Sequence, residues 1–173
     1  MAINTPFVYE RNCICIDKEI TNNAITIDGI DYFVYYLNPE YKNSKGANSY
    51  VFALYQAQNY MENDEYVPDK VIKISNKRDN NKSRSENNKR FYREIDALIE
   101  CKNRHIHNIV AISSFGQLSC KAKNMKGNDI SYLFPFYTMD YASGDLKSYL
   151  ENHDIPFEDR VNLCLQIANG LKE

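Results

Sequence analysis

A lysine inside an apolar run is the feature that most constrains this chain. In "YVPDKVIKIS", residues 66–75, Lys73 sits among Val71, Ile72 and Ile74, which together are typical of a buried strand. A buried ammonium group costs on the order of several kcal/mol unless an anionic group meets it. The sequence therefore predicts a sheet in which another element brings a carboxylate to Lys73.

Composition indicates a globular protein of about one domain. The 173 residues are 43% hydrophobic and 25% charged with a formal net charge of −2, which argues against a nucleic-acid or membrane-surface binder. The five cysteines include no C-x-x-C pair, so we expect reduced thiols and neither a disulfide framework nor a structural metal site. The N-terminus lacks the apolar core of a signal peptide, and no apolar run is long enough to span a membrane. We therefore expect a cytoplasmic protein.

The first half of the chain has the patterns of β-strands. The run "AITIDGIDYFVYYL" alternates around Asp28-Gly29, a strong signal for a two-residue hairpin. Residues 50–58 and 70–75 continue the strand pattern, with a polar loop between them. Residues 76–89 are polar without periodicity and indicate a loop. Residues 1–32 are expected to form an extension that could add a strand.

The second half mixes helices with strands. Apolar residues recur at helical spacing in "RFYREIDALIE" from Arg90, which predicts a helix with one apolar stripe. We expect a strand in "NIVAISSFG" that ends at Gly116, a loop over 118–129 and a strand over 130–142. Residues 143–152 and 157–173 are amphipathic and predict two helices. The fold class expected from this order is α+β.

These segments, in this order, resemble the eukaryotic-type protein kinases over roughly residues 33–173. The motifs are "SKGANSYV" as the glycine-rich loop, "VIK" as the ATP-lysine strand, "REIDALIE" as the helix with its glutamate, and "HNIVAISSFG" as the next strand. They continue with "FYTMDYASGDLKSYL" as the hinge and "FEDRVNLCLQIANGLKE" as the helix before the catalytic loop. The resemblance implies a kinase small lobe over 33–141, an antiparallel five-stranded sheet with one main helix. Residues 142–173 would supply two helices of an incomplete large lobe.

By this resemblance, Lys73 and Glu94 are the catalytic pair. The lysine would contact the α and β phosphates of ATP, and a carboxylate must hold it from the other side. Glu94 is the candidate because Phe91, Ile95 and Leu98 would pack its helix inward. The alternative is an exposed lysine on an edge strand, with Glu94 paired to Arg90 four residues earlier.

The resemblance also implies a set of nucleotide-binding residues. Only the middle glycine of the family's G-x-G-x-x-G-x-V loop, Gly46, survives, although small serines stand at the other two glycine positions and leave room for phosphate. An ordinary polar loop without a ligand is the alternative. Met139 matches the gatekeeper, or it simply fills the core. The full set is Ser44, Gly46, Asn48, Ser49, Val51, Val71, Lys73, Met139, the Asp140 carbonyl, the Ala142 N–H, and Asp145 at the ribose.

The chain carries no H-R-D or D-F-G motif, which in the family supply the catalytic base and the Mg²⁺ ligand. We therefore expect it to be a part of a kinase that is inactive alone, with the Mg²⁺ ligands beyond its last residue. The parent would transfer the γ-phosphoryl of ATP to a Ser, Thr or Tyr hydroxyl of a protein substrate. Alternatives are a kinase-like regulatory or pseudokinase module, or a small-molecule phosphotransferase. The apolar face of 157–172 could also support self-association.

Overall fold

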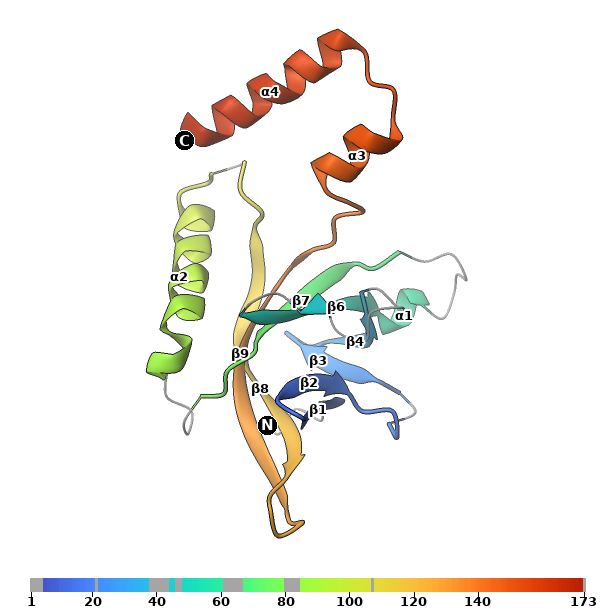
Figure 1. Ribbon diagram of the computed structural model, residues 1–173, viewed down its shortest axis with the longest axis vertical. Coiled ribbons are helices and arrows are strands. Elements are labelled where there is room, and N and C mark those ends of the chain that lie inside the picture. The colour runs from blue at the N-terminus through green and yellow to red at the C-terminus, as the bar shows by residue number, and fades with distance from the viewer. Residues whose placement is uncertain are drawn as a thin grey trace.

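A single strongly curled sheet, shaped like half a barrel, dominates the computed structural model (Figure 1). The structure describes residues 5–20, 22–37, 44–45, 48–60, 67–79, 85–106 and 108–172. Eight strands follow one path in the order β2-β1-β8-β9-β7-β6-β4-β3, and the short β5 pairs with β6. The strands are β1 Phe7–Glu10, β2 Cys13–Ile16, β3 Ala24–Ile27, β4 Ile30–Tyr36, β5 Ser44–Lys45, β6 Ser49–Gln56, β7 Lys70–Ser75, β8 Ile112–Lys123 and β9 Asp129–Asp140.

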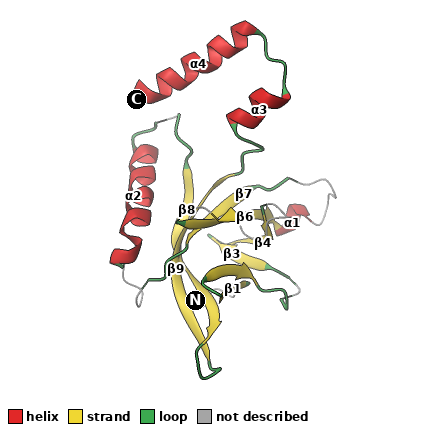
Figure 2. Ribbon diagram, viewed as in Figure 1, coloured by secondary structure: helices red, strands yellow, loops and turns green. Residues whose placement is uncertain are grey.

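The helices lie around this sheet, with the short α1 next to β4 and β6 on the side away from α2 (Figure 2). The longest two are α2, which lies alongside the sheet, and α4, which lies beyond its end. Among the described residues, no helix is both long enough and apolar enough to cross a membrane. The helices are α1 Ala57–Tyr60, a short 3₁₀ turn Glu86–Asn88, α2 Lys89–Asn103, α3 Leu146–Asn152 and α4 Phe157–Lys172.

The predicted fold, a five-stranded antiparallel sheet of a kinase small lobe, is wrong. Over the described residues the sheet has nine strands, and it is mixed because β1 pairs in parallel with β8 through Val8 and Lys121. The α+β class itself agrees with the structure. The N-terminal extension supplies β1, β2 and β3: β3 belongs to the expected hairpin, whereas β1 and β2 form a second hairpin, more than the single extra strand that the sequence suggests there.

Two local features explain why β1, β2 and the second half of β8 are not evident in the sequence. The turn between β1 and β2 uses Arg11 and Asn12, both at positive φ, and a bulky Arg gives no turn signal there. Residues 118–123, expected as a loop, belong to β8 instead: Leu118 and Cys120 are buried while Lys121 is exposed, the alternation of a strand with one wet face. Gly116, where the strand was expected to end, lies inside β8, and its lack of a Cβ leaves room for the ring of Phe136.

The expected hairpin around Asp28-Gly29 is confirmed. β3 and β4 pair antiparallel with Ile27 opposite Ile30, and both turn residues have positive φ, at 50° and 80°. This is the two-residue turn whose twist matches that of the flanking strands. The strand over 70–75 and the helix that contains Glu94 are also present as β7 and α2.

The inner face of the curled sheet carries the main hydrophobic core. Strands from both ends of the sheet contribute to it, since Phe7 of β1 contacts Phe52 of β6 with ring centroids 5.1 Å apart. The N-terminal strands thus cover an apolar surface that β6, β7 and β9 would otherwise expose. The buried members are Phe7, Ile14, Ile16, Ile25, Ile27, Tyr32, Val34, Tyr50, Phe52, Leu54, Ile72, Ile74, Leu118, Cys120, Phe134 and Phe136.

The outer face, defined here as the opposite side of the same strands, is where α2 packs. Phe91, Tyr92 and Ile95 of the helix are buried there against Ile112 and Tyr137 of the sheet. Leu98 and Ile99 are half-buried at the edge of this second cluster. The predicted apolar stripe of α2 is therefore the surface that holds the helix on the outer face.

Helices α3 and α4 are much more exposed than α2. Val161 and Leu165 of α4 are 40% and 55% exposed. One close approach joins α4 to the loop after α2, where Gly170 lies so near Asn108 that a Cβ would come within 2.9 Å of it. Self-association through α4 and the division at residues 141 and 142 stay predictions.

Candidate functional site

Strand alternation brings Lys73 out of the core. In β7, Ile72 and Ile74 point to the inner face and are fully buried, so Lys73 points to the outer face beneath α2. The register places Val51 of β6 and Tyr137 of β9 directly beside Lys73 on the two neighbouring strands. A lysine in an apolar run is accommodated here because it points away from the main hydrophobic core, to the face where α2 supplies a carboxylate.

The carboxylate that meets Lys73 is that of Glu94. Lys73 Nζ lies 2.5 Å from Glu94 Oε1, so the pairing predicted from the sequence is present. Phe91 and Ile95 are buried on the sheet side of α2, and their burial brings the intervening Glu94 to the edge that faces β7. The Lys73 side chain is 23% exposed and the Glu94 side chain is 40% exposed, so solvent and ligands can reach the pair.

Tyr137 supports the same carboxylate. Its hydroxyl donates to Glu94 Oε1 at 2.7 Å, and Lys73 Nζ lies 5.4 Å from the centre of its ring. Burial alone would raise the pKa of Glu94, but hydrogen bonds from Lys73 and Tyr137 and the charges of Lys73 and Arg90 lower it overall. The pKa of the Tyr137 hydroxyl is raised, mainly by burial and to a smaller extent by the neighbouring Glu94 carboxylate. Glu94 is therefore held as an anion and Tyr137 as a neutral donor.

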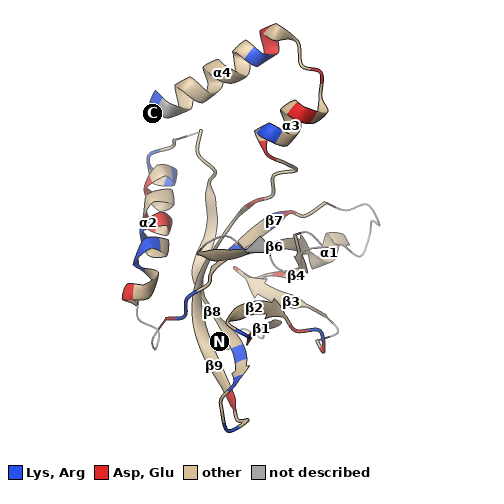
Figure 3. Ribbon diagram, viewed as in Figure 1, with Lys and Arg blue, Asp and Glu red and all other residues tan. Residues whose placement is uncertain are grey.

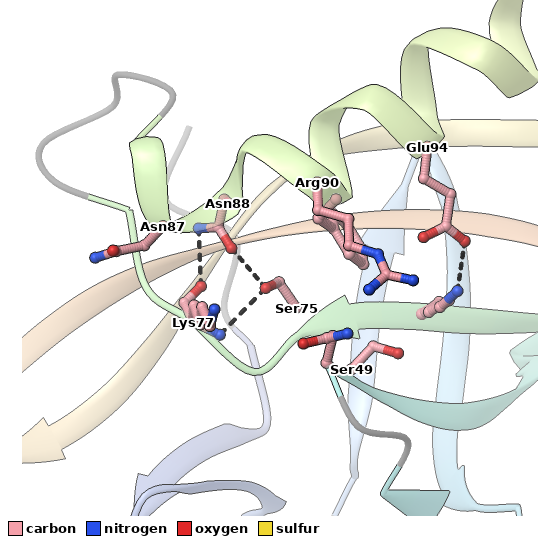
Figure 4. A pocket seen from close by; sticks show the side chains of 10 residues that line it. Ser49, Ser75, Lys77, Asn87, Asn88, Arg90 and Glu94 are labelled. Atoms are coloured by element: carbon pink, nitrogen blue, oxygen red, sulfur yellow. Dashed lines mark hydrogen bonds and ion pairs between the residues drawn. The ribbon is translucent and has the colours of Figure 1, made fainter.

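A pocket of about 500 Å³ opens beside this pair (Figure 4). Arg90 and Glu94 project into it from α2, while Ser49 and Ser75 line it from the strands. Its lining includes three cationic side chains against one carboxylate. Figure 3 shows that most of the strand residues carry no charge. The lining residues are Asn48, Ser49, Lys73, Ser75, Lys77, Asn87, Asn88, Arg90, Phe91 and Glu94.

One wall of the pocket is fixed by hydrogen bonds. Asn88, the residue before α2, accepts from Ser75 Oγ at 2.6 Å and donates to the carbonyl of Lys77 at 2.9 Å. Ser75 Oγ also accepts from the backbone N–H of Lys77 at 3.1 Å. The end of β7 and the start of α2 are thus joined on the pocket side, which leaves the Lys77 side chain exposed.

Some of the sequence-predicted nucleotide residues line this pocket and others lie beside it. Asn48, Ser49 and Lys73 line it, together with Glu94, the predicted catalytic partner of Lys73. Val51, Val71 and Met139 also lie on the outer face, since Val51 pairs with Lys73 and Val71 pairs with Met139. These three residues do not line the pocket.

The remaining predicted residues are farther along the chain or cannot be placed. The Asp140 carboxylate pairs with Lys70 at 3.6 Å, and Ala142 is exposed. Asp145 caps α3, where its carboxylate accepts from the Ser148 N–H at 2.8 Å. Ser44 pairs with Val51 through β5, and Gly46 lies outside the described residues.

Sequence reasoning missed part of the lining. Lys77 continues the spacing of Lys73 and Ser75 along one side of β7, and this period of two was a signal that could have been used. Arg90 was considered only as a local partner for Glu94. Tyr137 could not have been found, because its place beside Lys73 depends on the strand register.

No group of three or more His, Cys, Asp or Glu side chains that could hold a metal is found within the described ranges. Searches with protein-family models, of curated proteins and of solved structures found no match to this chain. What the chain does must therefore be inferred from the pocket and from the motifs around it.

Proposed function

We propose that this pocket binds the phosphate groups of a nucleotide such as ATP, and that the chain is the nucleotide-binding portion of a protein kinase. The observation that carries the proposal is the Lys73–Glu94 ion pair at the edge of a pocket lined by two further cations, Lys77 and Arg90. The order of the kinase-like motifs in the sequence supports the choice of ATP among phosphate ligands.

The charges in the pocket favour a polyanion. Glu94 engages Lys73 from the helix side, and an ammonium group has three donors, so donors remain for a ligand in the pocket. Lys77 and Arg90 give the lining a surplus of positive charge that Glu94 alone does not neutralise. Each charge-assisted hydrogen bond to a phosphate oxygen contributes about 1.5 to 3 kcal/mol.

Apolar residues next to the phosphate region suit a nucleotide base. Val51, Val71 and Met139 lie on the same face as Lys73: Val51 of β6 is directly opposite Lys73, and Met139 of β9 is directly opposite Val71. Small-molecule sites usually combine apolar side chains with a few placed polar or charged groups. ATP would supply the transferable phosphoryl group and bring Mg²⁺ with it, while the residues of this chain bind and orient the phosphates. The acceptor would be a Ser, Thr or Tyr hydroxyl of a protein substrate.

A titration with matched variants tests the proposal. ATP, AMP and inorganic tripolyphosphate are titrated by calorimetry and NMR shifts, up to millimolar concentration, into the wild type, Lys73→Ala and Lys121→Ala. Lys121 is the control because it is exposed on β8, away from the pocket lining. We expect ATP and tripolyphosphate to bind more tightly than AMP, and Lys73→Ala to weaken ATP about ten- to a hundredfold.

Two results would overturn the proposal. One is wild-type protein that shows no ATP-dependent shifts near Lys73 at millimolar nucleotide. The other is equal affinity for ATP in Lys73→Ala and in the wild type. Tripolyphosphate binding without any added affinity from the adenosine would retain the phosphate site but remove the nucleotide assignment.

A further inference from the structure

A buried carboxylate outside the pocket is linked to it through hydrogen bonds. Asp79 follows β7, is only 5% exposed and does not line the pocket. Its backbone N–H donates to the carbonyl of Leu133 on β9 at 2.7 Å, which ties the loop to the sheet. A buried carboxylate without hydrogen-bond donors would be strongly destabilising. The donors around the Asp79 carboxylate therefore indicate its role.

Five neutral donors surround this carboxylate. Oδ1 accepts from the Ser85 N–H at 3.2 Å, from Ser85 Oγ at 2.9 Å and from Asn88 Nδ2 at 2.6 Å. Oδ2 accepts from the Tyr92 hydroxyl and from Gln117 Nε2 at 2.6 Å. Burial raises the pKa of Asp79, but the bonds from Tyr92, Asn88, Gln117 and Ser85 outweigh it and lower the pKa overall. The donors therefore hold Asp79 as an anion.

These donors come from the elements that have to be aligned for the ion pair. Asn88 and Tyr92 belong to the start and the first turns of α2, and Gln117 belongs to β8. Asn88 uses its other atoms on Ser75 at the end of β7, the strand that carries Lys73. Glu94 lies only two residues beyond Tyr92 on the same helix, so a shift of the first turns of α2 would move Glu94 as well.

We propose that Asp79 is a positioning residue: it fixes the N-terminal turns of α2 against β7 and β8 so that Glu94 meets Lys73, and phosphate binding depends on it without direct contact. This inference rests on the proposed function for its effect on ligands. Its effect on the ion pair can be measured without any ligand.

The primary test is Asp79→Asn, which keeps the size of the side chain but presents an amide N–H₂ to groups that are themselves donors. The Glu94 carboxyl is titrated by ¹³C NMR in the folded wild type and in the variant. We expect the Glu94 pKa to lie below its ordinary range in the wild type. In the variant it should rise, because Glu94 moves away from Lys73. We expect the affinity for tripolyphosphate and ATP to fall about tenfold.

The control is Asp28→Asn. Asp28 also accepts a hydrogen bond from a side chain distant in sequence, Ser114 Oγ, but it lies at the β3–β4 turn away from the pocket lining. This variant should leave both the Glu94 titration and the affinity unchanged. A double variant, Lys73→Ala with Asp79→Asn, should bind no more weakly than Lys73→Ala alone, because the two residues act through one ion pair.

Distinct results separate this inference from the proposed function. A folded Asp79→Asn protein with wild-type Glu94 titration overturns the positioning role, whatever its melting temperature. Absence of ligand binding in the wild type overturns the proposed function, while the titration still decides the positioning role. Should Asp79→Asn not fold, Tyr92→Phe removes a single donor and keeps the ring; a Glu94 titration unchanged in this variant also overturns the inference.

Discussion

Around Lys73 the two faces of β6, β7 and β9 differ in chemistry, although they are built from alternating residues of the same strands. On the inner face, Phe52, Ile72 and Phe136 belong to the main hydrophobic core. On the outer face, Lys73 and Tyr137 surround a carboxylate beside an open pocket. Because neighbouring residues point to opposite faces, one strand can carry stability on one side and binding on the other. Adjacent substitutions should therefore separate the two properties.

The largest effect is expected from the inner face. Phe52 is fully buried and its ring contacts those of Phe7 and Tyr36. Phe52→Ala should lower the free energy of unfolding by roughly 3 to 5 kcal/mol, since it removes a ring and leaves a cavity. Urea unfolding followed by circular dichroism measures this change. A loss below about 1 kcal/mol would mean that the inner face is not the main source of stability.

Acid should act on the outer face, where the carboxyl groups of Glu94 and Asp79 lie. The pKa values of Glu94 and Asp79 are lowered in the folded protein, so their contribution is complete above the unfolded values of about 4. It is lost as the pH falls through the folded values. We expect the free energy of unfolding to decrease below about pH 4, and less steeply in Glu94→Gln. Urea titrations between pH 2.5 and 7 test this, and equal slopes in both proteins would contradict it.

Lys73→Ala should show the separation of stability from binding most directly. The Lys73–Glu94 pair keeps part of its solvent exposure, and pairs of this kind contribute about 0 to 1 kcal/mol to stability. The free energy of unfolding should therefore change by less than about 1 kcal/mol while ATP affinity falls at least tenfold. Urea unfolding and calorimetry on the same preparations provide both numbers. A large loss of stability with unchanged affinity would reverse the assignment of the outer face.

The smallest effect is expected from Tyr137→Phe. This change removes the hydroxyl that donates to Glu94 but keeps the ring against Phe91. A typical hydrogen bond contributes about 0.5 to 1.5 kcal/mol, so ATP affinity should fall by roughly two- to tenfold. The Glu94 pKa should also rise slightly in ¹³C NMR. An unchanged Glu94 titration would show that Lys73 alone sets the charge of this carboxylate.

The sequence was informative where strong local patterns coincide. The hairpin at Asp28-Gly29, the strand with Lys73 and the apolar stripe of α2 each follow from a short run of residues. The Lys73–Glu94 pair followed from the cost of burying an ammonium group together with the motif order. These inferences depend on residue types and spacing alone, and they needed no knowledge of strand neighbours.

The parts that failed depend on interactions distant in sequence. β1 and β2 have four residues each, too few to show a period, and the parallel contact of β1 with β8 leaves no trace in either strand. The network around Asp79 arises from a polar segment without periodicity, so its burial becomes visible only once Tyr92 and Gln117 are placed. Register and burial of this kind are set by tertiary structure.

The pairing of β1 with β8 also has a consequence for biosynthesis. Val8 and Lys121 are about 110 residues apart in the chain, so the ribosome needs roughly 5 to 20 seconds to deliver the partner of the first strand. During that interval the apolar residues Phe7, Ile14 and Ile16 have no β8 to cover them, and closing so long a loop adds an entropic cost. The nascent N-terminal hairpin therefore presents an unpaired strand edge, a template for pairing with other chains, until β8 has been synthesised.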